Sequence, residues 1–362
     1  MSQTTEVKFE SVIEDHLLHN GYCSIDVQDF DKTLSIFPQT VLSFIHQTQP
    51  KEWKKLEALH GEKTGDQIIS DLCKWMDTYG SLATLRHGFK CYGHTLHVAY
   101  FKPAHGLNQE LEALYQSNKV GISRQLHFSE KNEKSLDVVL SLNGIPVVTI
   151  ELKNPFTGQT VDDAMRQYRI DRDPREPIFE FKRRTLVHFA VDTEVVIMTT
   201  RLAAEATHFL PFNKGLNDGA GNPPDPSCRT YRTAYLWEEV LQRDSFLDLL
   251  ARFLHLQIET KFSDEGRKIK KETMIFPRYH QLQAVRKLVD AARAEGPGNN
   301  YLIDIPLGAA RATQSAGLHT GLHRCMMSKT IEYSIALSLS QIDWSWTSSC
   351  RIRYINSNIS KV

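Results

Sequence analysis

The 362-residue sequence has no net charge, no C-x-x-C pair and no long apolar run. Lys and Arg together number 43, as do Asp and Glu, so no global field draws the chain to DNA or to a membrane surface. The six scattered cysteines argue against a zinc site or a disulfide framework and fit a reducing cytoplasm. No apolar stretch approaches the roughly 20 residues that span a bilayer, and the polar start, MSQTTEVKFE, has no signal-peptide pattern. We therefore expect a cytoplasmic protein, without membrane partners, that binds nucleic acid only through local basic patches.

The pattern of apolar residues predicts an α/β protein with a mixed central sheet flanked by helices. In the first part of the chain, helices are expected over 9–20, 37–60 and 66–78 and strands over 81–103. A compact unit then follows, with a helix over 108–117, strands over 120–128 and 194–200, a hairpin over 136–153 and a helix over 160–168. This order of helix, three strands, helix and strand is typical of a sheet with helices on its faces.

The second part of the chain is more irregular. Residues 209–226 are dense in Gly, Pro and Asn and predict a long loop, whereas 235–260 return to a helical pattern. A turn and helix over 276–292 and a strand over 301–305 follow, and the last 57 residues contain only two acids. The expected domains are 1–260 with a core at about 105–225, a basic linker at 261–275, a further domain starting at 276–305, and a disordered, aberrant tail at 306–362.

The hairpin is the most informative stretch, because charges interrupt its apolar strands. Asn143-Gly144, the strongest short-range hairpin signal, lies between two runs of Val, Leu, Ile and Thr. Asp137 opens the first run, and Glu151 and Lys153 close the second. Such charges are costly to bury unless they pair or bind a metal.

The length of the hairpin loop decides whether these charges meet. A two-residue loop would place Asp137 opposite Ile150, and Glu151 would then point to the other face of the sheet. A three-residue turn with a bulge at Gly144 would bring Asp137, Glu151 and Lys153 to one face. We predict the odd loop.

Two carboxylates on one face suit a Mg²⁺ ion, which prefers oxygen ligands and keeps several waters. Asp137, Glu151 and the backbone carbonyl of Leu152 would hold it beside a scissile phosphate. The ion would polarise the phosphate and lower the pKa of a bound water, while Lys153 would orient that water or offset charge on phosphorus. The alternative is a surface salt bridge at a strand end, because E-x-K alone is common.

The D…E-x-K pattern on a helix-flanked hairpin resembles the PD-(D/E)xK nuclease superfamily. With AMRQYRIDRDPREPIF, RTLVHFAVDTEVVIMTTRL, FLPFNKG and GAGNPP, it resembles more specifically the restriction subunit of type I restriction–modification enzymes, over about residues 5–305. The resemblance implies a type I site-specific deoxyribonuclease that hydrolyses double-stranded DNA in defence against foreign DNA. It implies Asp137 and Glu151 as Mg²⁺ ligands, Lys153 as the catalytic lysine, ATP as a cofactor of the intact family member, and modification (methyltransferase) and specificity subunits as partners.

The family also has a Gln-x-x-x-Tyr element on the helix after E-x-K. Gln167 matches its glutamine, but Asp171 stands where the tyrosine belongs, and Tyr168 is adjacent instead. The resemblance and the arginine fork, which suits phosphates, suggest DNA contacts by Gln167, Tyr168, Arg169 and Arg172. The alternative is a solvated helix face whose cations complement the helix dipole.

Residues 276–281, FPRYHQ, resemble the adenine-recognising Q-motif that opens the first motor domain of helicase-like ATPases. Gln281 would pair with the adenine edge, supported by Arg278 or Tyr279. No G-x-x-x-x-G-K-[ST] loop follows, however, and the chain continues from Asp304 as DIPLGAARATQSAG. We interpret this change as a truncation or frameshift, and expect little or no ATP-dependent restriction.

Two other functions stay open at this stage. A stand-alone DNA repair or defence nuclease would cut DNA without partners or ATP. An inactive remnant would only dock on a modification methyltransferase.

Overall fold

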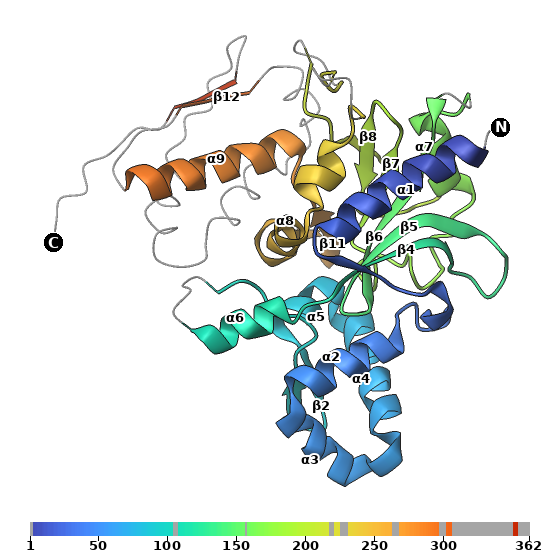
Figure 1. Ribbon diagram of the computed structural model, residues 1–362, viewed down its shortest axis with the longest axis vertical. Coiled ribbons are helices and arrows are strands. Elements are labelled where there is room, and N and C mark those ends of the chain that lie inside the picture. The colour runs from blue at the N-terminus through green and yellow to red at the C-terminus, as the bar shows by residue number, and fades with distance from the viewer. Residues whose placement is uncertain are drawn as a thin grey trace. The chain divides into compact units, whose positions relative to one another are not determined.

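The computed structural model describes residues 3–103, 108–155, 158–216, 221–224, 231–262, 268–296, 302–305 and 350–353 (Figure 1). The chain divides into two compact units. Unit 1 comprises Met1–Phe209 and Thr233–Ala251, and unit 2 comprises Leu210–Arg232 and Arg252–Val362. Each unit is described by itself.

Unit 1 is built on a mixed sheet with the strand order β1-β4-β5-β6-β7-β8. The strands are β1 (Tyr22–Ser24), β4 (Val120–His127), β5 (Ser135–Leu142), β6 (Ile145–Leu152), β7 (Val187–Val191) and β8 (Val196–Thr199). The pairs β1–β4 and β6–β7 are parallel, and the other neighbours are antiparallel. A separate two-stranded sheet pairs β2 (Phe89–Cys91) with β3 (His94–Leu96). The α/β class with a mixed, helix-flanked sheet is confirmed.

The helices of unit 1 begin and end at recognisable sequence signals. They are α1 (Gln3–His19), α2 (Pro38–Thr48), α3 (Pro50–His60), α4 (Thr64–Tyr79), α5 (Ser81–His87), α6 (Gln109–Gln116), α7 (Val161–Ile170) and α8 (Arg243–Asp248), with a π-helical turn, η4, at Leu236–Val240. Proline occupies the first position of α2 and α3, where its missing N–H costs nothing. Thr160 is the N-cap residue of α7, and Asp163 accepts a hydrogen bond from the Thr160 N–H at 2.9 Å.

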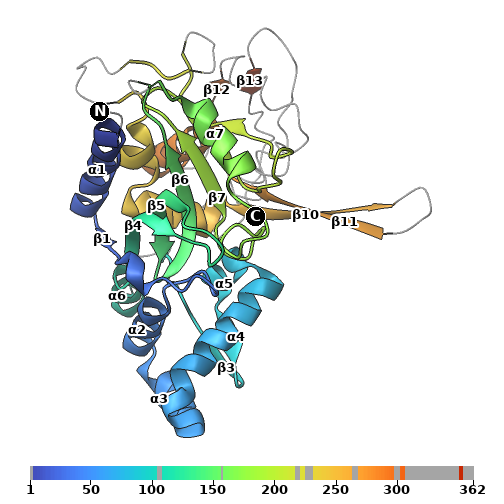
Figure 2. The same ribbon diagram turned by 90° about the vertical axis from the view of Figure 1, so that its right-hand side faces the viewer.

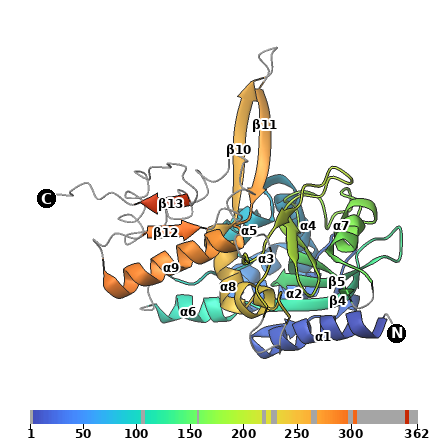
Figure 3. The ribbon, with the colours of Figure 1, turned by 90° about the horizontal axis from the view of Figure 1, so that it is seen from above.

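Helices α1 and α7 cover opposite faces of the sheet. Tyr168 of α7 bonds to Thr149 of β6. Arg124 of β4 bonds to Glu10 of α1 and pairs with Val138 of β5, which in turn pairs with Ile150 of β6. Because neighbouring residues in a strand point to opposite faces, the two helices lie on different sides. Figure 2 shows α7 in front of β6 and β7, and Figure 3 shows α1 alongside β4 and β5.

The core cluster that contains the buried residues of α7 is made of aromatic and aliphatic side chains from the sheet, from α7 and from the loop after it. Its buried members include Leu126, Phe128, Leu136, Val139, Ala164, Tyr168, Ile178, Phe179 and Ala190. The rings of Phe128 and Phe179 meet edge to face with centroids 5.0 Å apart. Burying one such side chain contributes about 1.5–3 kcal/mol, so this core fixes α7 on the sheet.

Unit 2 contains a two-stranded antiparallel arm and a long helix. Its elements are β9 (Leu210–Pro211), β10 (His255–Phe262), β11 (Lys268–Ile275), α9 (Tyr279–Glu295), β12 (Leu302–Ile305) and β13 (Cys350–Arg353), and the π-helical turn η5 spans Leu249–Phe253 at the unit boundary. Strands β10 and β11 pair over eight residues each and form the extended arm in Figure 3. No helix in the described ranges is long and apolar enough to cross a membrane.

Three predictions of local structure were wrong. Residues 81–87 form the helix α5 rather than a strand, bounded by Gly80 (φ 90°) and Gly88 (φ 75°). Residues 255–260 are a strand rather than a helix, and most of the expected linker is its partner β11. The pairing sets opposite charges across from each other, as in Glu259 and Lys271. Apart from 350–353, the predicted tail at 306–362 lies outside the described residues.

Candidate active site

The hairpin between β5 and β6 has a two-residue loop, so the predicted odd loop was wrong. Leu142 pairs directly with Ile145 across Asn143-Gly144. Both loop residues have positive φ, 50° and 88°, as expected for the tight turns that match strand twist. Asn143 is fully buried, and its side chain accepts a hydrogen bond from the N–H of Lys119 at 2.7 Å. The loop conformation is therefore fixed by the surrounding protein.

A β-bulge in β6 nevertheless brings the carboxylates together. Ser141 pairs with Pro146, but Leu140 pairs with Val148, which leaves Val147 as an extra residue. Beyond the bulge the register has moved by one. The continued register therefore places Asp137 and Glu151 on one face of the sheet, as predicted. The reason differs from the predicted one, because the extra residue lies in the strand and not in the loop.

The shifted register creates one row of polar side chains across three strands. The last residue pair of the β5–β6 ladder is Val138 with Ile150. The same register, continued by one residue, places Asp137 opposite Glu151. On the other side of β5, Gln125 lies between Arg124 and Leu126, which pair with Val138 and Leu136, and its side chain bonds to Asp137. Gln125 has φ of 50°, which is uncommon for a non-glycine residue. Gln125, Asp137 and Glu151 therefore lie side by side on β4, β5 and β6.

Glu151 is fully buried and forms an ion pair with Arg172, which lies in the turn after α7. The Arg172 Nε donates to Glu151 Oε1 at 2.7 Å, and Nη2 reaches the same oxygen at 2.6 Å. The other oxygen, Glu151 Oε2, is buried and has no hydrogen-bond partner. Such atoms are costly in the absence of a partner, so Oε2 is the atom of this site that most needs an explanation.

Asp137 is half-buried and held at both oxygens. Its Oδ2 accepts a hydrogen bond from the N–H of Leu152 at 2.7 Å, and its Oδ1 accepts one from Gln125 Nε2 at 3.3 Å. The same Gln125 nitrogen donates to Glu10 Oε1, on α1, at 2.9 Å. Gln125 thus connects the first helix of the chain to the candidate site.

The electrostatics of the site favour a cation. Burial, and then the negative charge of Asp137, raise the pKa of Glu151 to about 8, although the positive charges of Arg172 and Lys153 act in the opposite direction. Burial and Asp137 also raise the pKa of Glu10. The carboxylates around Asp137 therefore repel each other, and a positive charge between them would relieve that repulsion.

Glu10, Gln125 and the contact of Arg172 with Glu151 are parts of the site that were not predicted from the sequence. Glu10 follows Phe9 on the buried stripe of α1 and is itself only 4% exposed. A glutamate on such a stripe is a sequence signal, because acidic side chains are rarely buried without a partner. Its partners, Arg124 and Gln125, lie more than a hundred residues away, so the signal indicates no location.

The four side chains expected to contact DNA differ in exposure. Tyr168 is fully buried, and its hydroxyl lies 2.8 Å from the Thr149 hydroxyl. Arg172 is 2% exposed and bound to Glu151. These two side chains are therefore not available for DNA in this structure. Gln167 and Arg169 are half-buried, and the Arg169 guanidinium lies over the Phe209 ring at 5.0 Å.

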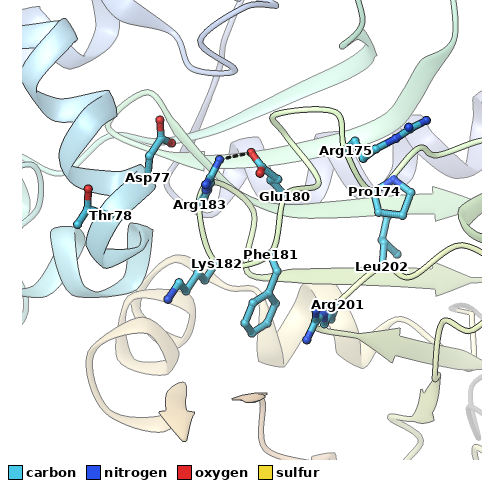
Figure 4. A pocket seen from close by; sticks show the side chains of 10 residues that line it. All are labelled: Asp77, Thr78, Pro174, Arg175, Glu180, Phe181, Lys182, Arg183, Arg201 and Leu202. Carbon is cyan, nitrogen blue, oxygen red and sulfur yellow. Dashed lines mark hydrogen bonds and ion pairs between the residues drawn. The ribbon is translucent and has the colours of Figure 1, made fainter. Parts of the chain in front are cut away.

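The loop after α7 contributes to a basic pocket elsewhere on unit 1 (Figure 4). The pocket has a volume of about 510 Å³, and is lined by Asp77, Thr78, Pro174, Arg175, Glu180, Phe181, Lys182, Arg183, Arg201 and Leu202. Arg183 bonds to Glu180 at 2.6 Å, and the Arg201 guanidinium lies over the Phe181 ring at 4.9 Å. Most of the cations of this loop therefore line a surface separate from the Asp137–Glu151 row.

In unit 2, Gln281 is used to cap a helix. Its side-chain oxygen accepts a hydrogen bond from the N–H of Arg278 at 2.9 Å at the start of α9. Arg278 is buried, which lowers its pKa. Nucleotide binding by Gln281 and Arg278, and the start of a helicase-like domain at 276–305, stay predictions.

No cluster of three or more His, Cys, Asp or Glu side chains that could hold a metal occurs in the described ranges. A cation at this row would therefore have two carboxylates, Asp137 and Glu151, completed by backbone and water oxygens. Mg²⁺ is the ion that such sparse protein coordination suits.

The fold and the row of carboxylates define an α/β protein with a polar site on a central hairpin, and sequence comparison finds a family that part of the chain resembles. Residues 101–207 match the family described as the type I restriction enzyme R protein N terminus. This part of the chain is therefore similar to the N-terminal region of a type I restriction R protein, and the resemblance derived from the sequence is confirmed. None of the curated proteins compared with the chain matches it.

Proposed function

We propose that unit 1 is a Mg²⁺-dependent endonuclease with a PD-(D/E)xK fold, acting on double-stranded DNA as part of a type I restriction enzyme. The family match supports the biological setting. The observation that carries the chemistry is Glu151 Oε2, a buried carboxylate oxygen without a partner beside a second carboxylate. A hard divalent cation is the partner that two such groups accept most readily.

The residues of the row fit this ion. Asp137, Glu151 and the carbonyl of Leu152 would hold Mg²⁺, which supplies a polarised phosphate and a water of lowered pKa when bound. The hydrogen bonds from Leu152 N–H and Gln125 fix the Asp137 carboxylate. Lys153 has no ion-pair partner within the described residues, so its ammonium is available to orient the water or offset charge on the phosphate.

The proposal is tested with the purified chain, supercoiled plasmid DNA and Mg²⁺. Asp137→Ala and Lys153→Ala are expected to abolish cleavage while the far-ultraviolet circular dichroism and the melting temperature stay close to those of the original protein. Lys119→Ala is the control, since it changes an exposed lysine at the other end of the hairpin. Cleavage that persists in both site variants, or that is independent of metal, would contradict the proposal.

We also propose that the chain assembles with modification and specificity subunits. The support is the family match alone. Co-expression with a type I methyltransferase complex, followed by size-exclusion chromatography, is expected to give one co-eluting peak. Separate elution at micromolar concentrations would contradict it.

A further inference from the structure

The contact between Arg172 and Glu151 is unusual in its geometry. Arginine and a carboxylate commonly meet fork to fork, with two parallel bonds to two oxygens. Here Nε and Nη2 of Arg172 both bond to Oε1, and Oε2 receives nothing. A contact selected for stability alone would satisfy both oxygens, because an unpaired buried acceptor costs about 1–3 kcal/mol.

Arg172 is itself held rigidly. Its Nη2 donates to the carbonyl of Ser135 at 2.6 Å, and its guanidinium lies over the Phe128 ring at 5.4 Å. Backbone, ring and carboxylate thus fix one orientation of the guanidinium plane. Glu151 is anchored through Oε1 and is itself fully buried, so its second oxygen, Oε2, is left without a bond to Arg172.

A second buried arginine in unit 1 shows that this arrangement is particular. Arg184 is 4% exposed and bonds to Asp77 Oδ1 at 2.8 Å and to the carbonyl of Leu34 at 2.8 Å. The Asp77 side chain is 44% exposed, so water can satisfy its second oxygen. The two pairs therefore differ in the second carboxylate oxygen. In the Arg172–Glu151 pair this oxygen is buried and has no protein partner, whereas in the Arg184–Asp77 pair it can bond to water.

We propose that Arg172 is a positioning residue that holds Glu151 by one oxygen and presents the other, Oε2, as a ligand for a divalent cation shared with Asp137. This inference rests on the proposed metal site. It also replaces DNA contact as the role of Arg172. Outer partners that orient metal ligands commonly account for 10–100-fold in metal affinity, which sets the size of the expected effect.

The test measures metal binding directly, with Mn²⁺ followed by electron paramagnetic resonance in the absence of DNA. Arg172→Met is expected to weaken Mn²⁺ binding by about 10–100-fold. Arg172→Lys keeps the charge but has one donor nitrogen in place of two, and is expected to recover part of that loss. Arg184→Lys is the matched control: it disturbs an equally buried arginine of the same unit and is expected to leave Mn²⁺ affinity unchanged, whatever it does to the melting temperature.

The outcomes separate the two proposals. If the original chain binds Mn²⁺ and Asp137→Ala abolishes this binding, the site exists; unchanged Mn²⁺ affinity in the folded Arg172→Met variant would then overturn only the role of Arg172. Equal losses of affinity in Arg172→Lys and Arg184→Lys would also overturn it, since the effect would follow general destabilisation. If the original chain neither binds Mn²⁺ nor cuts DNA, the proposed function fails and the role of Arg172 fails with it.

Discussion

The carboxylates on the β5–β6 hairpin and the glutamine at the start of α9 both belong to short motifs, but their atoms are used differently. The side-chain oxygen of Gln281 accepts a hydrogen bond from the N–H of Arg278. This is a capping contact of a kind that occurs at many helix N-termini. Glu151 keeps one buried oxygen without a partner. An occupied polar atom is explained by the fold alone, whereas a buried acceptor without a partner, beside a second carboxylate, marks a candidate ligand position. For any motif recognised from sequence alone, the same comparison can be made by asking whether its buried polar atoms already have hydrogen-bond partners within the protein.

The largest effect expected from this difference is on Glu151. Glu151→Gln keeps an acceptor for Arg172 but removes the charge, and we expect cleavage to fall by about 10²–10³-fold, the equivalent of several kcal/mol of transition-state stabilisation. Glu176→Gln is the matched control, because Glu176 is also buried but bonds to Ser129 and Lys131. Equal cleavage by the two variants in a plasmid assay would remove the distinction between them.

The pH dependence of metal binding follows from the raised pKa of Glu151. Below about 8 the carboxyl takes up a proton, and a protonated carboxyl does not ligate a metal well, so Mn²⁺ affinity is expected to fall as pH falls. For one proton the slope approaches tenfold per pH unit below the pKa, and because half of the carboxyl is already protonated at pH 8, the expected fall between pH 8 and pH 6 is about 50-fold. The measurement is a Mn²⁺ titration at pH 6, 7 and 8, and a flat profile would argue against ligation by Glu151.

A smaller effect concerns the turn that sets the register. Gly144 has φ of 88°, and a Cβ there would lie 2.6 Å from the carbonyl oxygen of Phe37. Gly144→Ala is therefore expected to lower the free energy of unfolding by about 1–3 kcal/mol. Gly93→Ala has a similar φ of 80° but nothing within 4 Å of the new methyl group, so the difference between the two variants in urea unfolding isolates the contact. Equal losses would assign the whole effect to backbone strain.

The smallest effect is expected at Gln281. Gln281→Ala removes the cap of α9 and should cost about 1 kcal/mol of stability, without changing DNA cleavage. Gln281→Glu keeps the oxygen and should retain that stability. Chemical unfolding and a fluorescent ATP analogue distinguish the two roles: loss of nucleotide binding in Gln281→Glu, with stability retained, would show that the side chain reads adenine.

Local signals explain why much of unit 1 could be predicted. Asn143-Gly144 specifies a hairpin turn, and Thr160 marks the start of α7. The bulge at Val147 was missed, although Pro146 precedes it and proline within a strand commonly marks a bulge. That signal could have been read from the sequence.

Other features depend on partners distant in the chain. The Arg172–Glu151 contact joins residues 21 positions apart, and the bridge from Glu10 through Gln125 joins residues 115 apart. Strand β10 was mistaken for a helix because its apolar pattern is short, and only its pairing with β11 decides its conformation. The local pattern of apolar residues does not predict these contacts, because it carries no information on which distant residues meet.

Because of the bulge at Val147, the site depends on the number of residues between Asp137 and Glu151. Side chains in a strand alternate between faces, so one residue gained or lost between Asp137 and Glu151 moves one carboxylate to the other side of the sheet. Among related chains, the length of this hairpin should therefore change in even steps, and an odd step should be accompanied by the gain or loss of a bulge. A chain that breaks this rule keeps every residue of the motif and loses the site.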